Sequence, residues 1–230
     1  MQAVILAGGL GTRLRPITEK IPKCMAPVGD KPFLFYLLKL LKERGVEQVV
    51  LCIGYLGEQI EDYFKNGRRF GIAIRYSQEK GSLLGTGGAL KLAEDLLEKD
   101  FLVINGDTYL DDDYRKIYDA FIENDKESLV VAYPTEDADP GNLKIDKDLL
   151  VTKYGKEAKG LGYVDAGVLV LKRYVISGIE SGNTVSLENE LFPLLINRSQ
   201  MAAFITKQKY YDIGTFAKLK CFENCLLRTV

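Results

Sequence analysis

Histidine and tryptophan are both absent from the 230 residues of this sequence. Without an imidazole there is no histidine general base and no histidine-rich zinc site, so any chemistry must depend on carboxylates, Lys and Arg. Cysteine is scarce, with four residues and no C-x-x-C pair, and the helical spacing of Cys221 and Cys225 is better explained by burial or chance than by a shared metal. We therefore expect a reduced, cytoplasmic protein.

An excess of either charge is also missing, as is any apolar run long enough to span a membrane. The 31 Lys and Arg residues nearly balance the 32 Asp and Glu residues, which predicts that neither polymeric nucleic acid nor a membrane is a partner. The sequence opens with a predicted strand, with no signal segment expected. A hydrophobic content of 47% is ample for a core, and we expect one domain over residues 1–230.

Glycine, in contrast, is concentrated directly after the first apolar run, in the stretch Gly8-Gly9-Leu10-Gly11-Thr12-Arg13, with Lys23 beyond it. Glycines at the end of a first strand let backbone N–H groups approach a polyphosphate, and Arg13 and Lys23 add cations. The dinucleotide fingerprint is excluded because Leu14 replaces its third glycine, and a Walker A loop needs Gly-Lys-Ser/Thr. The stretch predicts the mouth of a nucleotide site, the alternative being a glycine turn with an incidental Arg.

The pattern of elements changes near residue 113. Before it, strands are expected at 3–6, 48–53, 72–76 and 101–105, alternating with helices at 32–44, 57–64 and 87–97. Asp30 is expected to cap the first helix and Gly45 to end it. After it, strands are expected at 128–133, 142–145, 149–153 and 163–171, and helices at 186–197 and 215–227. The order predicts an α/β fold with a nucleotide-binding half, 1–112, and a substrate-facing half, 113–230.

Two carboxylates follow predicted strands. Asp107 comes after Asn105-Gly106, at the edge of the sheet where open α/β proteins bind ligands, and Asp212 precedes Ile213-Gly214. With phosphate oxygens and waters, two such ligands satisfy Mg2+, although each Asp could instead be a helix cap or a turn residue. The run 111–113 is interpreted as a solvated helix start.

A second glycine loop, Leu84-Gly85-Thr86-Gly87-Gly88-Ala89, opens another predicted helix and could pass close to a flat ring. Glu79 could accept from the N1 and N2 edge of guanine, or be an ordinary exposed acid. Asp165 and Glu188 could accept from sugar hydroxyls, but Glu188 is equally explained as the first turn of a helix beginning near Ser186.

Together, the motifs at 6–23, 84–89, 105–107 and 212–215 resemble the sugar-nucleotide pyrophosphorylases of the nucleotidyltransferase family. Within it, Met25-Ala26-Pro27-Val28 and the short length are most similar to D-glycero-D-manno-heptose 1-phosphate guanylyltransferases, with N-acetylmuramate 1-phosphate uridylyltransferases close by. The resemblance implies a Rossmann-like, GT-A-type fold with a mixed, mostly parallel sheet flanked by helices.

It also implies a Mg2+-dependent transfer of a nucleotidyl group from GTP or another NTP to a sugar 1-phosphate. The products would be pyrophosphate and an NDP-sugar, and the NDP-sugar would serve surface polysaccharide synthesis. Arg13 would hold the β and γ phosphates, Lys23 would bridge the α-phosphate and the sugar phosphate, and Asp107 and Asp212 would bind the metal. The nucleotide-binding residues would be Leu6, Ala7, Gly8, Gly9, Gly11, Thr12, Glu79, Gly85, Thr86, Gly87 and Asp107. The sugar-binding residues would be Asn105, Asp165, Gly167 and Glu188.

One departure from the family leaves the sugar open. The lysine that grips the sugar phosphate is unassigned among Lys153, Lys156 and Lys159, and Asp165 stands where asparagine is usual. A uridylyltransferase acting on a hexose or N-acetylmuramate 1-phosphate is one alternative to the guanylyltransferase.

Two alternatives belong to other classes of function. One is a non-catalytic nucleotide or sugar sensor, and the other is a glycosyltransferase using the run 111–113. A homodimer is expected as a further partner.

Overall fold

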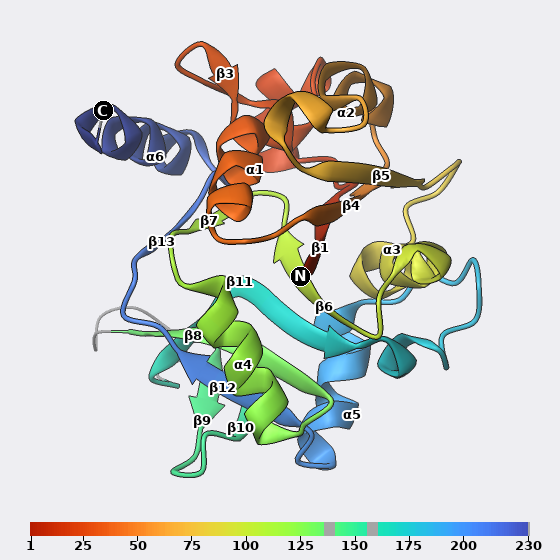
Figure 1. The fold of residues 1–230 in the computed structure, drawn as a ribbon, viewed down its shortest axis with the longest axis vertical. Helices are drawn as coiled ribbons and strands as arrows, with labels where there is room; N and C mark the ends of the chain where they lie inside the picture. The colour runs from red at the N-terminus through yellow and green to blue at the C-terminus, as the bar shows by residue number, and fades with distance from the viewer. Residues whose placement is uncertain (136–140, 156–160, 230) are drawn as a thin grey trace.

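The computed structural model describes residues 1–135, 141–155 and 161–229 and places them in an α/β fold built on a nine-stranded mixed sheet (Figure 1). Seven strands run in the order β10-β9-β11-β6-β1-β4-β5, and off this path β8 pairs with β11 and β12 pairs with β8. The half around β1 is parallel, whereas β11 is antiparallel to β6 and β8. The expected α/β fold with a mixed sheet is confirmed.

The sheet strands alternate with helices as the sequence predicts for its first part. The strands of the large sheet are β1 Gln2–Ala7, β4 Gln48–Ile53, β5 Ala73–Gln78, β6 Asp100–Asn105, β8 Ser128–Pro134, β9 Leu143–Ile145, β10 Val151–Tyr154, β11 Tyr163–Lys172 and β12 Met201–Ile205. The α-helices are α1 Phe33–Glu43, α2 Gly57–Phe64, α3 Gly85–Leu92, α4 Tyr114–Asn124, α5 Phe192–Asn197 and α6 Phe216–Thr229. Two small antiparallel ladders pair β2 Pro27–Val28 with β3 Lys31–Pro32 and β7 Thr108–Leu110 with β13 Tyr210–Asp212.

Helices cover both faces of the sheet. Both faces are apolar, since successive side chains of strands such as β1 point to opposite sides of the sheet, and each apolar face is buried by helices. Ala3 and Ile5 belong to the core beneath α1, α2, α4 and α6, whereas Val4 belongs to the core beneath α3 and α5. A buried parallel strand accordingly reads as a continuous apolar run. No helix in the described part of the chain is long and apolar enough to cross a membrane.

Several local predictions are corrected. Asp30 does not cap α1, because Asp30 lies in the β2–β3 turn and strand β3 comes between it and the helix. The exposed Asp30 instead pairs with Lys31 at 3.0 Å. The helix predicted at 87–97 begins earlier, at Gly85, and ends at Leu92 before a 3₁₀ turn, Glu94–Leu96. The helix predicted at 186–197 is a π-helical turn, Leu187–Leu191, followed by α5. The buried strand β12 was not predicted.

The acidic run 111–113 does begin a helix, but its side chains are not simply solvated. Asp113 caps α4 by accepting from the backbone N–H groups of Arg115 and Lys116, at 3.1 and 3.2 Å. Asp111 pairs with Arg44, and Asp112 accepts from the hydroxyl of Thr206. The three carboxylates therefore have three separate tasks, and they do not converge on one ion.

Candidate active site

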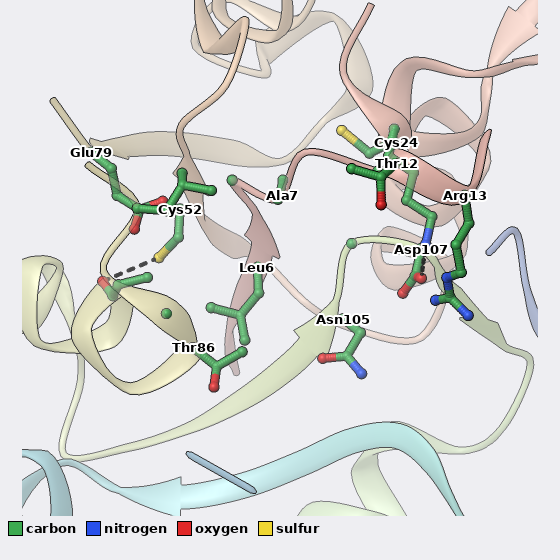
Figure 2. Close-up of a pocket in the computed structure, with 18 residues that line it drawn as sticks. Leu6, Ala7, Thr12, Arg13, Cys24, Cys52, Glu79, Thr86, Asn105 and Asp107 are labelled. Atoms are coloured by element: carbon green, nitrogen blue, oxygen red, sulfur yellow. Dashed lines mark hydrogen bonds and ion pairs between the residues drawn. The ribbon is translucent and has the colours of Figure 1, made fainter. Parts of the chain in front are cut away.

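A cavity of about 390 Å³ opens at the carboxyl ends of β1 and β6 (Figure 2). These strands are parallel neighbours, so the loops that follow them meet at one edge of the sheet, where open α/β folds bind ligands. The cavity brings together four parts of the chain, namely residues 6–24, Cys52, residues 79–89 and residues 105–107. Of the predicted site residues, it is lined by Leu6, Ala7, Gly8, Gly9, Gly11, Thr12, Arg13, Lys23, Glu79, Gly85, Thr86, Asn105 and Asp107.

The first glycine loop turns sharply at Gly11, which has a φ of +60°. A Cβ there would lie 2.9 Å from both Lys23 Cβ and Thr18 Cγ2, so only glycine fits. Thr18 Oγ1 donates to the carbonyl of Gly11 at 2.9 Å and holds the turn, and the fully buried Leu14 anchors its other end. The adjacent Arg13 is exposed at the cavity and has no ion-pair partner among the described residues. Its guanidinium is available to an anion.

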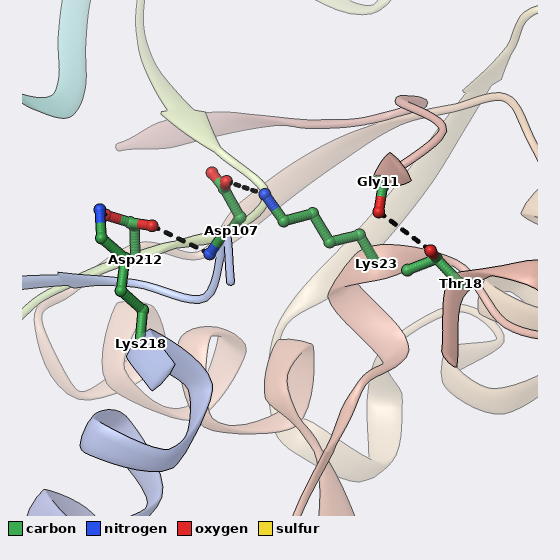
Figure 3. Close-up of polar contacts among 7 residues, drawn as sticks. Gly11, Thr18, Lys23, Asp107, Asp212 and Lys218 are labelled. Atoms are coloured by element: carbon green, nitrogen blue, oxygen red, sulfur yellow. Dashed lines mark hydrogen bonds and ion pairs between the residues drawn. The ribbon is translucent and has the colours of Figure 1, made fainter. Parts of the chain in front are cut away.

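Lys23 and Asp107 meet across the cavity in an ion pair (Figure 3). Lys23 is held by the 3₁₀ turn Lys23–Met25, and Asp107 follows Gly106, whose N–H donates to the carbonyl of Leu6 at 2.9 Å. Their side chains are 17% and 24% exposed, so the pair is sheltered but can be reached from the cavity.

Glu79 and the second glycine loop form the opposite wall. Glu79 Oε1 accepts from the backbone N–H of Leu84 at 2.6 Å, and Oε2 lies against Gly8, so the carboxylate spans both glycine loops. Burial raises the pKa of Glu79. Gly87 is different from the other predicted nucleotide residues, because its N–H donates to the carbonyl of Val185 at 2.8 Å and it does not line the cavity.

Thr86 connects this wall to the substrate-facing half. Its hydroxyl donates to Glu188 Oε2 at 2.9 Å and accepts from the N–H of Leu187 at 2.8 Å. Ser186 caps the π-helical turn and also donates to Glu188 Oε2 at 2.9 Å. Glu188 thus lies in the first turn of a helix, as one interpretation expected, and its carboxylate is fixed beside a residue that lines the cavity.

Asp165 lies on β11 outside the lining, in a polar cluster of its own. Tyr154 donates its hydroxyl to Asp165 Oδ2 at 3.0 Å, and the N–H of Gly167 donates to Oδ1 at 2.8 Å. Burial raises the pKa of Asp165 to about 6. Lys153 is exposed on β10, and it is the next residue, Tyr154, that reaches Asp165. Lys156 and Lys159 lie outside the described residues.

Asp212 is brought beside Asp107 by the small β7–β13 ladder. It stands opposite Thr108, and the N–H of Ile213 donates to the carbonyl of Asp107 at 3.0 Å. A Cβ on Gly214 would lie 2.8 Å from Asp212 Oδ1 and 3.2 Å from Arg13 Nη2, so Arg13 also reaches this point. Sequence reasoning missed Lys218, whose Nζ forms an ion pair with Asp212 (Figure 3).

The donor set suits a hard divalent cation. Carboxylate oxygens are the ligands that Mg2+ prefers, and it usually takes one or two of them together with phosphate oxygens and waters. Asp107 and Asp212 supply two carboxylate groups at adjoining backbone positions. One oxygen of each carboxylate is paired with a lysine ammonium group. No larger cluster of acidic or cysteine side chains occurs within residues 1–135, 141–155 and 161–229, so the phosphates of a ligand would have to complete the coordination.

Comparison with known proteins places this arrangement in a family. The sequence profile of the Nucleotidyl transferase family matches residues 2–226. Two D-glycero-alpha-D-manno-heptose 1-phosphate guanylyltransferases are similar: that of Campylobacter jejuni is 35% identical over 93% of this chain and 95% of its own, and that of Aneurinibacillus thermoaerophilus is 34% identical over 93% of both. The structure of HddC from Yersinia pseudotuberculosis complexed with GMP-PN has a TM-score of 0.84 and 31% identity, covering 98% of this chain and 99% of that one.

The glycine loops, the basic pair at the cavity and these similarities over nearly the whole length agree with one another. The chain therefore belongs to the nucleotidyl transferase family and is a sugar-1-phosphate nucleotidyltransferase.

Proposed function

We propose that this enzyme transfers GMP from GTP to D-glycero-D-manno-heptose 1-phosphate, releasing pyrophosphate and forming GDP-heptose. The observation that carries the proposal is the cavity in which Arg13, Lys23 and Asp107 meet between two glycine loops. The specific substrates are supported by the two similar guanylyltransferases and by the GMP-PN complex of the similar HddC protein.

The chemistry requires no general base. An oxygen of the sugar phosphate, already ionised, would attack the α-phosphorus of GTP in line with the bond to the β-phosphate. The new P–O bond forms as that bond breaks, and its electrons leave with pyrophosphate. A chain without histidine can catalyse this reaction, since positioning and charge neutralisation supply most of the rate enhancement in phosphoryl transfer.

Arg13 and Lys23 would neutralise the negative charge of different phosphate groups. Arg13, exposed and without an ion-pair partner in the described chain, would bind the β and γ phosphates and stabilise the departing pyrophosphate. Lys23 would leave Asp107 to bridge the α-phosphate and the sugar phosphate. Asp107 and Asp212 would hold Mg2+, which when bound supplies positive charge to the phosphate oxygens. The remaining lining residues at 6–12 would cradle the nucleotide with backbone N–H groups.

Glu79 is the residue we assign to base recognition. Its Oε1 is engaged by Leu84, while Oε2 accepts no hydrogen bond from the described residues. A partly buried acceptor of this kind suits the N1–H and N2–H donors of guanine. Glu79→Gln would place an amide donor against those donors, so we expect it to reduce the kcat/KM with GTP by about 10- to 100-fold, the usual effect of an unpaired polar group at a buried contact.

The sugar would lie between β6 and β11. Asn105 lines the cavity, Glu188 is held beside Thr86, and Asp165 is fixed by Tyr154 and Gly167. Carboxylate and amide oxygens suit a polyol, because each accepts hydroxyl protons at fixed angles. Asp165 provides a carboxylate at the position where asparagine is usual in the family, so the sugar is to be identified by direct comparison of several sugar 1-phosphates.

A substrate matrix tests the whole proposal. The protein would be incubated with Mg2+, each of the four NTPs and a panel of sugar 1-phosphates that includes heptose, mannose, glucose and N-acetylmuramate, while pyrophosphate is measured. We expect GTP with heptose 1-phosphate to have the highest kcat/KM. A preference for UTP with a hexose or N-acetylmuramate 1-phosphate would establish the alternative, and nucleotide binding without turnover across the matrix would favour a sensor.

A further inference from the structure

Lys218 lies beside the Asp212 carboxylate and forms an ion pair with it. Its Nζ is paired with Asp212 Oδ2, while Oδ1 accepts from the N–H of Gly214 at 2.9 Å (Figure 3). The Asp212 side chain is 21% exposed and that of Lys218 is 54% exposed. The carboxylate is therefore fixed by the backbone, and the lysine is the member of the pair that can move away.

The position of Lys218 on α6 is unfavourable for the helix itself. Thr215 precedes the helix, and its Oγ1 accepts from the backbone N–H of Lys218 at 3.4 Å. In this type of capping motif the third helical residue is usually Glu or Gln, because the amino end of a helix is positively polarised. Helix stability does not explain a lysine there, whereas the ion pair with Asp212 does.

Lys218 and Lys23 together neutralise the two carboxylates of the site, and Arg13 adds a further positive charge close to them. Two ammonium groups face two carboxylates, Asp107 and Asp212, and the ladder holds these carboxylates at neighbouring backbone positions. A divalent cation arriving alone would meet no net attraction. A cation that arrives with a triphosphate is different, because the phosphates offer the displaced lysines new anionic partners.

We propose that Lys218 is a positioning residue that keeps Asp212 neutralised until a divalent cation and the nucleotide bind together. Lys218 thereby suppresses cation binding to the empty enzyme. The proposal rests on one part of the proposed function, that Asp212 is a cation ligand, and it does not depend on which base or sugar is used.

The test measures Mn2+ binding to the nucleotide-free protein by the loss of the free Mn2+ electron paramagnetic resonance signal. Lys218→Gln should bind Mn2+ about threefold to fivefold more tightly than the wild type, the upper range for an exposed ion pair. Lys218→Arg should restore the wild-type affinity. Lys220→Gln is the matched control, since Lys220 lies on the same helix and pairs with Glu223 at 3.5 Å, and it should change the affinity by less than about twofold.

A second comparison assigns the effect to the pair. Adding Asp212→Asn to Lys218→Gln should abolish the gain in Mn2+ affinity. The proposal is overturned if Lys218→Gln binds Mn2+ no more tightly than the wild type, if Lys220→Gln gains as much, or if no variant binds Mn2+ at all. Because no turnover is measured, these results stand even if GTP or heptose 1-phosphate proves to be the wrong substrate.

Discussion

At the scale of single residues, Arg13 is the side chain on which catalysis should depend most. It faces the cavity without an ion-pair partner in the described chain, so its removal should leave the fold intact. We expect Arg13→Ala to lower kcat by about 100-fold or more, as removal of one preorganised electrostatic contact does in other enzymes. Arg15→Ala is the control, because Arg15 is exposed and does not line the cavity. Equal activities of the two variants would remove Arg13 from the mechanism.

Asp165 gives a prediction about pH. Burial raises its pKa from an ordinary 3.8 to about 6, so the folded protein holds this proton more strongly than the unfolded chain does. The stability that this provides is complete below about pH 4 and is lost as the pH rises through about 6. Asp165→Asn keeps an acceptor for Tyr154 or Gly167 and removes the buried charge.

The melting temperature of Asp165→Asn should accordingly rise relative to the wild type between pH 4.5 and pH 8. For a chain of this size a gain of about 1 kcal/mol corresponds to about 2–4 °C. Asp119→Asn serves as the control, because it removes the same charge from an exposed position on α4. A difference between Asp165→Asn and the wild type that is independent of pH would contradict the assignment.

At the scale of elements, the packing of α3 against the segment before the π-helical turn joins the two halves of the chain. The N–H of Gly88 donates to the carbonyl of Val185 at 3.2 Å, and a Cβ on Gly88 would lie 2.5 Å from the carbonyl oxygen of Asn183. Backbone atoms cannot yield as a flexible side chain would. Gly88→Ala must therefore push α3 away from this segment.

We expect Gly88→Ala to lower the free energy of unfolding by about 1–3 kcal/mol, the usual cost of overpacking, and to raise the KM for the nucleotide. Gly178→Ala is a suitable control, since a Cβ there would meet no atom within 4 Å. Urea denaturation of both variants measures the difference. If Gly88→Ala proves as stable as Gly178→Ala, close packing of α3 against residues 183–185 does not contribute to stability.

Element prediction succeeded where the residue pattern is local and failed where a partner far away decides. The runs at β1, β4 and β6 are continuous and apolar, which is typical of strands covered on both faces. β12 was not predicted, because residues 201–205 form a strand only by pairing with β8, which lies far earlier in the sequence. Asp30 was misassigned because residues 31–32 pair with residues 27–28 as a short strand, β3, which separates Asp30 from α1.

At the scale of the whole molecule, binding should couple to stability, since the cavity is built from four parts of the chain that unfolding separates. With Mg2+ and GTP at about 100 times the dissociation constant, linkage predicts a gain of about 2.7 kcal/mol. That gain corresponds to a rise of about 5–10 °C in melting temperature. EDTA should remove most of the rise, and Arg13→Ala should reduce it. A rise in melting temperature unaffected by either treatment would contradict a metal-dependent triphosphate site.

The homodimer expected from the sequence stays a prediction, and light scattering would test it.

The sequence by itself predicted a nucleotide site, because glycines and cations at fixed spacing after a first strand are a local pattern that phosphate binding requires, and the reaction class followed from the resemblance of its motifs to a known family. It also predicted most of the residues that line the cavity. Only the tertiary structure decided which charges meet: Lys23 with Asp107, Lys218 with Asp212, and Thr86 with Glu188. These pairs join residues brought together by the sheet and its ladders, or by the first turn of α6, and spacing along the chain carries too little information to specify them.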